Sequence, residues 1–557
     1  MGYAMMWLEW LAAAVLFVAF VTACAARIRS GRRRMIVCIL AALLPPAKGA
    51  ALAALFGYVA SITLRPWYTY HWFVFWFMLA ACSAVGIVLV LVRGLRKRGD
   101  PPMPNAAAWP RGKLVLALAA VLLLSWMTLW NLDLSVKGRL AALRAEAGAL
   151  ALSTVPPRPL EAENAAPVYR QAFDAMLKGD DLPPEYPKWT VSSKGRDDVD
   201  FDPADPKLAA FLARSEGALG LLRRASAMPA CYFDHDYGRP SFSMSLPEME
   251  DFRNAARLLA LDARVKAAHG QMPRAMEDVR AMFALARHGM TNPILVPLLI
   301  ACGTDEMAVH TLEAVMKSTQ PPAPLLAGLG LSASEEYGRN LPRVLRMEEA
   351  FVVSAMVDIG IGEDVSVLEA MGMRGASQPA LQEVLTDPLL AGWRVFLAQE
   401  EMVAYRAGIR EYQRLAAMPY YEVAKEWREL AKPESIRRRG LMATMLMPAI
   451  GQCATVVTRA DARHAVACAA VAAARYRAEK GRLPETLDAL VPEYLPAVPR
   501  GPFDGKPLRM VARDGRLVFY SIGPDTKDGG TAFDEEKGTG DITFSLPVNL
   551  AKSSETR

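Results

Sequence analysis

The densest group of side chains that could do chemistry lies at Asp234, His235 and Asp236. Aspartate and histidine bind metals, and a carboxylate beside an imidazole can orient it for acid–base catalysis. Consecutive residues rarely point their side chains to one place, however. We therefore expect an Asp- and His-rich turn between two helices. An envelope hydrolase that uses these three residues is kept as the alternative function.

Motifs of well-known catalytic mechanisms are absent from the sequence. It contains no G-x-S-x-G, no S-x-x-K followed by S-D-N, and no H-E-x-x-H. It also lacks a glycine-rich phosphate-binding loop. We expect a non-enzymatic protein and a structural role for the isolated histidines His269, His288, His310 and His464.

Four cysteines lie beyond the apolar amino-terminal region, at Cys231, Cys302, Cys453 and Cys468. In an oxidising compartment they could form disulfides. Their pairing is open, because four cysteines allow three connectivities. Buried, unpaired cysteines are the equal alternative. The sequence has no C-x-x-C pair, so it does not support a zinc site.

The most specific pattern in the chain lies near its carboxyl end. An Ala-rich helix is predicted over Ala460–Lys480, and Gly481 ends it. Two strands are expected further on, with a hairpin turn at Asp514-Gly515 between them. The elements predicted after the helix are a short helix over Glu485–Leu490 and strands over Leu508–Ala512 and Arg516–Ser521.

This region resembles the globular part of the major pseudopilins of type II secretion systems. The resemblance covers about residues 460–545, under a sixth of the chain. It implies a small α+β module with a calcium-binding loop. The motifs that carry it, in order, are Arg475-Tyr476-Arg477, Gly481-Arg482-Leu483-Pro484, Pro502-Phe503-Asp504-Gly505 and Tyr520-Ser521-Ile522-Gly523-Pro524-Asp525.

The resemblance also implies the calcium ligands. Asp525 matches the loop aspartate of the family, and Asp541 matches the aspartate that closes the loop. Asp528 and Asp534 lie between them and match less well. Calcium takes six to eight oxygen ligands, which carboxylates and carbonyls of a glycine-rich loop can supply. A solvated acidic loop is the alternative.

The chain also departs from the pseudopilin pattern. Gly501 stands where the family often has aspartate, and the family's leading processing site is missing. An apolar stretch, Gly440–Val457, precedes the module instead. We interpret it as a buried helix, with a fifth membrane crossing as the alternative. We therefore expect something other than an ordinary pilus subunit.

The mean hydropathy of the chain is +0.15, and its apolar excess lies in the first 131 residues. Four apolar stretches there approach the ~20 residues that cross ~30 Å of hydrocarbon as a helix. We predict four transmembrane helices over Trp7–Ala26, Gly49–Leu64, Trp72–Val92 and Leu114–Trp130.

Basic residues set the expected orientation of these helices. The runs Arg32–Arg34 and Arg96–Arg98 follow the first and third stretches, so both loops are placed in the cytoplasm. The amino terminus and everything after Trp130 then lie in the periplasm of a bacterial inner-membrane protein. Lys48 is expected to snorkel to the headgroups, with a functional intramembrane lysine as the alternative.

Helical periodicity dominates the exported region. The clearest pair is Glu248–His269 with Met272–His288, joined at Gly270, which resembles a tetratricopeptide-type hairpin. Residues 178–206 are expected to form a polar surface loop. Other helices are predicted over Val136–Leu152, 163–177, Leu208–Ala227, Pro293–Met316, Ser332–Val357, Gln378–Leu385 and, with breaks, Leu389–Leu430.

We therefore expect a mainly α membrane protein in three parts. These are a transmembrane region (1–131), an irregular all-α extracytoplasmic domain (132–432), and a long helix with the pseudopilin-like α+β module (433–557). The second part resembles bacterial membrane-anchored proteins of unknown function.

The expected role is that of a periplasmic scaffold or binding protein, associated with a secretion or pilus-like assembly. Its partners would be the lipid bilayer and envelope proteins. The net charge of +6 is modest and partly lies in the cytoplasmic loops, so no nucleic acid is expected. A ligand sensor ranks last, because short cytoplasmic loops leave no room for an output domain.

Overall fold

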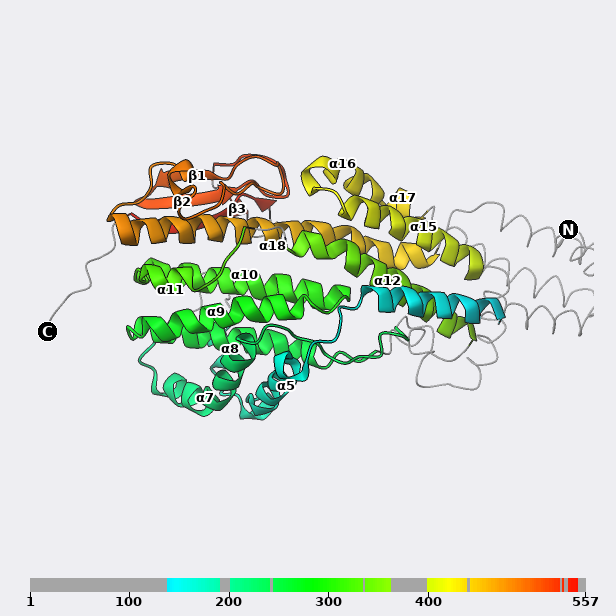
Figure 1. Cartoon of the computed structure of the whole chain (residues 1–557), viewed down its shortest axis with the longest axis horizontal. Coiled ribbons are helices and arrows are strands. Elements are labelled where there is room, and N and C mark those ends of the chain that lie inside the picture. Colours follow the sequence, from blue (N-terminus) through cyan, green and yellow to red (C-terminus); the bar gives the residue numbers. More distant parts are fainter. Residues whose placement is uncertain are drawn as a thin grey trace, which may run out of the picture. The chain divides into compact units, whose positions relative to one another are not determined.

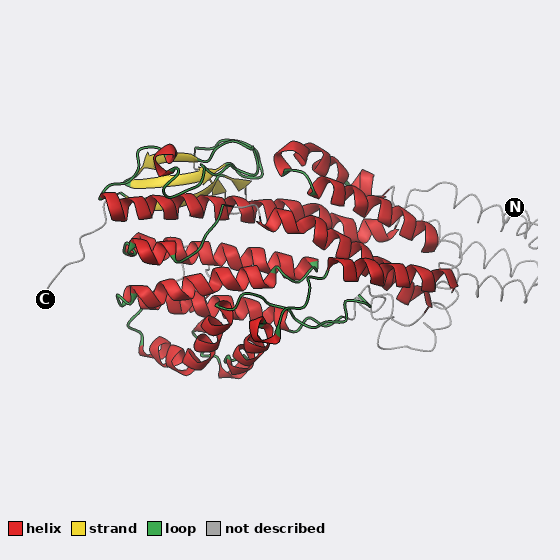
Figure 2. Ribbon diagram, in the orientation of Figure 1, coloured by secondary structure: helices red, strands yellow, loops and turns green. Residues whose placement is uncertain are grey.

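A computed structural model shows a mainly helical chain with a small three-stranded sheet near its carboxyl end (Figure 1; Figure 2). The predicted transmembrane helices, with Lys48, and the predicted helix over 378–385 lie outside the described residues. The structure describes residues 138–190, 201–240, 244–333, 336–361, 398–437, 441–530, 533–534 and 539–548.

The chain forms two compact units. The first, which we call the body unit, consists of Ala142–Gln382, Arg406–Lys432 and Leu446–Arg557. The second consists of the remaining segments, Met1–Ala141, Glu383–Tyr405 and Pro433–Met445, and is described only at helical segments. The chain leaves the body unit after Lys432 and returns to it at Leu446.

The described helices follow the predicted periodicity closely. A helix over 138–154 comes first, and the 3-10 turns are η1 (Glu161–Glu163), η2 (Gly179–Asp181) and η3 (Leu487–Leu490). The α-helices are α5 (Ala166–Ala175), α6 (Tyr186–Thr190), α7 (Pro206–Ser226), α8 (Glu248–Ala268), α9 (Met272–Gly289), α10 (Leu295–Ser318), α11 (Ala323–Ala327), α12 (Glu336–Ile361), α15 (Ala398–Ala416), α16 (Tyr420–Leu430), α17 (Pro433–Arg437) and α18 (Leu441–Lys480).

The predicted hairpin of α8 and α9 is confirmed. Gly270 lies between the helices with a φ of 73°, a conformation that ends a helix readily when the residue is glycine. Ala263 and Ala275 are fully buried, and their small side chains let the two helices approach closely. Helix α10 packs against both, so these three helices form the centre of the body unit.

Helix α10 is also apolar enough to be mistaken for a membrane span. Among the described residues, Leu295–Lys317 is the one segment long and apolar enough to cross a bilayer, and 67% of its most apolar window is buried in the protein. The core of the body unit accounts for this burial, which makes the segment weak evidence for a membrane crossing.

Two segments predicted separately form one helix. Residues Leu441–Val457 of the apolar stretch and the Ala-rich Ala460–Lys480 both belong to α18, which runs unbroken through Pro448. The β-branched residues 455–458 lower the local helix propensity. Val457 and Thr458 are buried in the structure, and tertiary packing outweighs that small local preference.

The sheet has the order β1-β2-β5 and is antiparallel throughout. Strands β1 (Arg509–Arg513) and β2 (Arg516–Ser521) confirm the predicted hairpin, and positive φ angles at Asp514 and Gly515 match a type I′ turn. Strand β5 (Ile542–Pro547) was not predicted. A separate two-stranded ladder pairs β3 (Phe533–Asp534) with β4 (Thr539–Gly540).

The sheet belongs to the same hydrophobic core as the helices. Phe519 of β2 lies opposite Phe544 of β5, and both are fully buried in one cluster with residues of α8, α9, α10 and α18. Strand β5 also contacts α10 directly, where the backbone N–H and hydroxyl of Ser545 donate to Glu313 at 3.0 and 2.8 Å. The carboxyl-terminal sheet is therefore built into the body unit (Figure 2).

The predicted polar surface loop over residues 178–206 contains two short helical elements in its described part. Turn η2 and helix α6 lie there, and Trp189 of α6 is 5% exposed. Its ring packs against Phe211 of α7 at a centroid distance of 5.9 Å. Burial of this large aromatic side chain offsets the cost of ordering a polar segment.

Candidate functional site

The side chains of Asp234, His235 and Asp236 do not converge. Asp234 is exposed and pairs with Arg158 at 3.3 Å, and Asp236 is exposed as well. His235 turns inward, where its Nε2 lies 2.6 Å from Oε1 of Glu248 in the first turn of α8. The segment is the predicted turn between α7 and α8, and the three residues form no shared site.

The His235–Glu248 pair fastens this turn to the core. Both side chains are under 10% exposed, and the rings of Phe233 and Tyr237 flank the imidazole at 6.4 and 5.6 Å. This short hydrogen bond between the imidazole and the carboxyl group connects the turn to α8. We assign the pair a structural role.

The four cysteines of the body unit are free and buried. Burial raises the pKa of the Cys231 and Cys302 thiols, and that of Cys453 to about 12. A thiol with a raised pKa stays protonated and is a poor nucleophile. Of the two alternatives left by the sequence, the structure has the buried, unpaired cysteines.

The described aspartates of the loop proposed to bind calcium differ in burial and in hydrogen-bond partners. Asp525 accepts a hydrogen bond from the backbone N–H of Lys527 at 3.2 Å, as in a turn. Asp541 is 1% exposed. The side chain of Asp534 lies outside the described residues. Within the part of the chain that the structure describes, no three His, Cys, Asp or Glu side chains gather into a metal-binding group.

Asp528 is held by an arginine. Its carboxylate lies 2.9 Å from Nε of Arg509, and the same guanidinium donates to Asp504 at 2.8 Å. The Arg509 side chain also lies over the ring of Tyr520, 5.9 Å from its centroid. A protein cation thus already neutralises one of the four predicted ligands.

Close contacts explain two glycines of the motif. A Cβ at Gly501 would lie 2.7 Å from Oγ of Ser521, so the structure has no room for the aspartate that the pseudopilin pattern often carries there. A Cβ at Gly523 would lie 1.9 Å from the carbonyl oxygen of Gly540. The side chains of Ser521 and Asp504 crowd the first position, and the backbone of Gly540 crowds the second, so both favour glycine.

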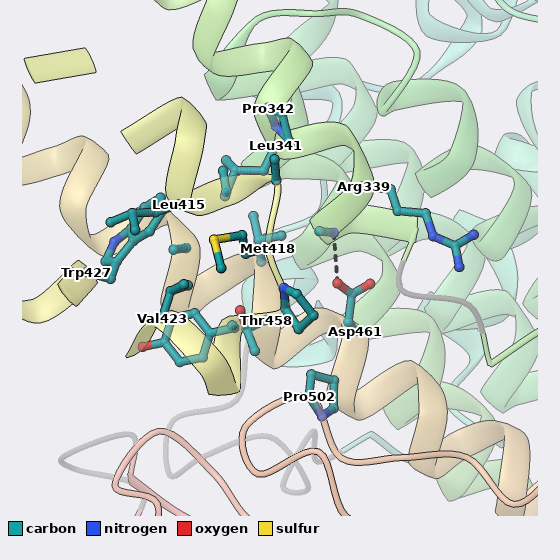
Figure 3. Close-up of a pocket in the computed structure, with 17 residues that line it drawn as sticks. Arg339, Leu341, Pro342, Leu415, Met418, Val423, Trp427, Thr458, Asp461 and Pro502 are labelled. Atoms are coloured by element: carbon teal, nitrogen blue, oxygen red, sulfur yellow. Dashed lines mark hydrogen bonds between the residues drawn. The ribbon is translucent and has the colours of Figure 1, made fainter. Parts of the chain in front are cut away.

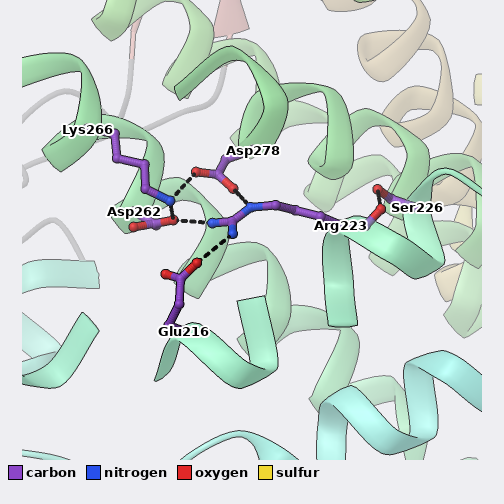
Figure 4. Close-up of polar contacts among 6 residues, drawn as sticks. All are labelled: Glu216, Arg223, Ser226, Asp262, Lys266 and Asp278. Atoms are coloured by element: carbon purple, nitrogen blue, oxygen red, sulfur yellow. Dashed lines mark hydrogen bonds and ion pairs between the residues drawn. The ribbon is translucent and has the colours of Figure 1, made fainter. Parts of the chain in front are cut away.

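A buried ionic network joins α7, α8 and α9 (Figure 4). Arg223 donates to Asp278 at 2.6 Å and to Asp262 at 2.5 Å, and Lys266 lies beside both carboxylates. The two aspartates are at most 3% exposed. Burial and the charge of Asp262 raise the pKa of Asp278, although Arg223 opposes the shift. Arg223 and Lys266 each lie beside both carboxyl groups, which indicates a structural network.

A second buried pair joins α10 to α18. Nδ1 of His464 lies 3.0 Å from Oδ1 of Asp305, which is 1% exposed. Burial would lower the pKa of His464, but the charge of Asp305 outweighs it and the pKa is raised well above its usual value. The other oxygen of Asp305 has no hydrogen-bond partner among the described residues.

The Asp305–His464 pair lines a small cavity. Its volume is about 70 Å³, and Phe283, Tyr337 and Arg287 line it too. This volume holds one or two waters and no organic substrate. No local sequence pattern marks the pair, because its two residues are 159 positions apart on two different helices.

A larger pocket lies elsewhere in the body unit (Figure 3). Its volume is about 380 Å³, and it is lined by α12, the turn between α15 and α16, α16, α18 and Pro502. Ligand pockets are commonly of this size, largely apolar and furnished with a few polar groups. The pocket meets this description, and no sequence motif marks its lining.

Comparison with known proteins assigns neither a family nor a function to this chain. Neither the protein-family models, nor the curated proteins, nor the solved structures include a match to this chain.

Proposed function

We propose that this protein is a non-enzymatic, membrane-anchored scaffold or binding protein of the bacterial envelope. Four amino-terminal helices would hold it in the inner membrane, and the body unit would lie in the periplasm. The apolar stretches and basic loops of residues 1–131 support this location. The pseudopilin-like motifs support a role near a secretion or pilus-like assembly.

The integration of the module into the body unit carries the scaffold proposal. A subunit that polymerises must keep surfaces of its module exposed for contacts with neighbouring copies. Here Phe519 and Phe544 of the sheet share a core with α10 and α18, and Glu313 binds the backbone of Ser545. These contacts favour a fixed platform over a polymerising subunit.

Motif residues also have structural partners within the unit. Arg477, from the tyrosine–arginine pair, donates to the carbonyl of Pro547 at the end of β5 at 2.5 Å. The ring of Tyr476 packs against that of Tyr494 at 5.6 Å, and Tyr494 donates to Glu479 at 2.7 Å. Such contacts support a pseudopilin-like fold of the module. They give Tyr476 and Arg477 of the motif a role in packing.

Crosslinking in cells tests location and role together. A membrane-impermeant lysine reagent is added to cells with a permeabilised outer membrane, and the full chain is recovered from the inner membrane. Exposed lysines such as Lys207 and Lys432 should react and join the chain to a discrete envelope protein. A cytoplasmic marker protein serves as the unreactive control. An unmodified body unit would contradict the periplasmic location, and modification without any discrete partner would contradict the scaffold role.

Calcium is the second element of the proposal. It rests on the pseudopilin resemblance and on the buried carboxylate of Asp541, while the contact of Arg509 with Asp528 argues against a four-aspartate site. If calcium binds, a concentration 100-fold above the dissociation constant should stabilise the protein by about 2.7 kcal/mol. The melting temperature of the full chain should then rise when calcium replaces a chelator.

Asparagine variants test whether Asp525 and Asp541 are the residues that bind calcium. Changing Asp525→Asn and Asp541→Asn together should abolish the rise in melting temperature. Asp514→Asn is the matched control, because Asp514 is 87% exposed on the neighbouring hairpin turn and asparagine also accepts a positive φ. A melting temperature of the unaltered chain that is the same in calcium and chelator would refute the metal site.

A further inference from the structure

We propose that the 380 Å³ pocket of the body unit binds a neutral, largely apolar small molecule that carries an aromatic ring. The inference goes beyond the scaffold role and depends neither on that role nor on the pseudopilin resemblance. It rests on the fixed apolar walls of the pocket, on charged lining groups that are bonded elsewhere or turned away, and on a thioether at the mouth.

The apolar walls come from three helices that meet around the pocket. Leu341 lies on α12, Leu415 lies near the end of α15, and Val423 and Trp427 lie on α16 (Figure 3). All four residues are at most 4% exposed, so the core around them fixes their side chains. A pocket of this volume has room for roughly ten to twenty non-hydrogen atoms of a ligand, which is typical of small-molecule sites.

The indole of Trp427 is held in place within the protein. Its Nε1 donates to the carbonyl of Gly451 at 2.8 Å, and the ring of Tyr412 packs against it at a centroid distance of 5.0 Å. The polar atom of the indole is therefore satisfied without a ligand. What this side chain offers to the pocket is the apolar surface of a fixed aromatic ring, which favours contact with another ring.

Three proline rings complete the lining. Pro342 lies within α12, Pro419 precedes α16, and Pro502 belongs to the loop that follows α18 and η3 (Figure 3). The ring of a proline fixes its backbone φ and leaves no freely rotating side chain. These walls therefore lose little conformational entropy when a ligand binds, which is the condition for a preorganised site.

Asp461 of α18 lines the pocket, but its carboxylate already has partners in the protein. The residue is 4% exposed, and its two oxygens accept the backbone N–H groups of Tyr337 and Gly338 at 3.0 and 2.8 Å (Figure 3). It also takes part in a further interaction within the chain. Both N–H groups belong to the first turn of α12, where a negative charge is favourable. We therefore assign Asp461 to the attachment of α12 to α18 and give it no part in holding the ligand.

The other charged residue of the described lining is Arg339. It is exposed, and its guanidinium points away from the apolar side chains (Figure 3). The hydroxyl groups of Thr458 and Tyr420 carry no charge, and that of Tyr420 lies 3.3 Å from Oγ1 of Thr455. A charged ligand would therefore lose its hydration in the pocket without gaining a counter-ion there, whereas a neutral ligand avoids this cost.

A methionine lies at the mouth of the pocket. Met418 is 40% exposed at the turn between α15 and α16, and its side chain lies among the lining residues (Figure 3). Its sulfur is 3.9 Å from Nη1 of Arg414 on α15. Methionine side chains adapt their shape readily, and a thioether makes favourable contacts with aromatic rings. Together with the indole of Trp427, this side chain favours a ligand whose apolar part is an aromatic ring.

Four probes of similar size test the proposal. The full chain in lipid nanodiscs is titrated with naphthylethanol, naphthylethylammonium, naphthylacetate and decalinylethanol, and binding is followed by calorimetry with empty nanodiscs as the blank. Naphthylethanol should bind saturably at one site per chain. The ammonium and the carboxylate should bind roughly tenfold or more weakly, because each would bury a charge without a counter-ion. Decalinylethanol, the saturated analogue, should bind roughly two- to tenfold more weakly, because it lacks the aromatic ring.

Variants of the mouth place the probe in this pocket. Met418→Trp puts a larger side chain among the lining residues and should abolish saturable binding of naphthylethanol. Met418→Ala removes the thioether contact and should weaken binding roughly two- to tenfold. Leu160→Trp is the matched control, because Leu160 is 70% exposed and does not line the pocket, and it should leave binding unchanged.

Each outcome supports or overturns the proposal. Absence of saturable binding of naphthylethanol, or binding of either charged probe as tight as that of the alcohol, would overturn it. Equal binding of decalinylethanol would refute the aromatic ring as part of the ligand. Binding that survives Met418→Trp would refute this pocket as the site. If circular dichroism shows that Met418→Trp fails to fold, the effect of Met418→Ala against the Leu160→Trp control decides the location.

Discussion

Replacing Arg223 with methionine is expected to destabilise the body unit by about 3–5 kcal/mol. The change removes one cation from the network in Figure 4 and leaves Asp262 and Asp278 with Lys266 alone. These carboxylates are 3% and 0% exposed, so water cannot replace the lost guanidinium. A loss of this size should lower the melting temperature of the full chain by roughly 5–15 °C.

A double-mutant cycle identifies the cause of this loss. Asp278→Asn removes one of the stranded carboxylates, so the double variant with Arg223→Met should recover at least about 1 kcal/mol compared with additive effects. The penalty of Arg223→Met should also shrink as the pH falls through the pKa of Asp278, which burial raises to about 8, because a protonated Asp278 no longer needs a cation.

An exposed ion pair on α8 provides the comparison. Arg253 lies 3.1 Å from Glu250, with 49% and 59% of the two side chains exposed. Arg253→Ala should cost at most about 0.5 kcal/mol, because water screens such surface pairs. Equal melting-temperature losses for Arg223→Met and Arg253→Ala would show that the buried network does not carry the expected energy.

Local patterns predicted the elements whose signals are local. The α8–α9 hairpin has strong periodicity, and Gly270 marks its turn. The β1–β2 hairpin has an Asp-Gly pair that suits a type I′ turn, with a strand-like run on each side. In both cases the residues that determine the structure lie within a few positions of each other, so a single sequence contains the information.

Strand β5 and the full length of α18 depend on distant partners. Strand β5 is stabilised by pairing with β2, more than twenty residues earlier, and by Glu313 on α10, which binds Ser545. In α18 the β-branched run at residues 455–458 has a weak helix preference that burial overrides. Neither effect is visible in a short window of sequence.

The candidate sites were harder to predict than the fold. Asp234, His235 and Asp236 are adjacent in sequence, yet consecutive side chains point in different directions and Asp234 ends at the surface. The Asp305–His464 pair and the pocket around Asp461 are assembled from helices far apart in the chain. Their residues have no shared spacing, so only the packing of the helices brings them together.

The change Phe544→Ala should destabilise the helices and the sheet together. Phe544 is fully buried opposite Phe519, and truncation of a buried phenylalanine to alanine costs about 3–5 kcal/mol. The core that contains Phe544 is continuous with α8, α9, α10 and α18. The cost should therefore appear throughout the body unit, because one continuous core unfolds as one cooperative structure.

Hydrogen exchange with mass spectrometry on the full chain measures this coupling. In Phe544→Ala, slow amides of α9 and α10 should lose as much protection as those of β2 and β5. Val511→Ala is the control, since Val511 is 38% exposed on the edge strand β1 and should have little effect. Protection lost in the sheet alone would instead reveal an independently folding module, such as a pilus subunit requires, and would remove the main support for a fixed scaffold.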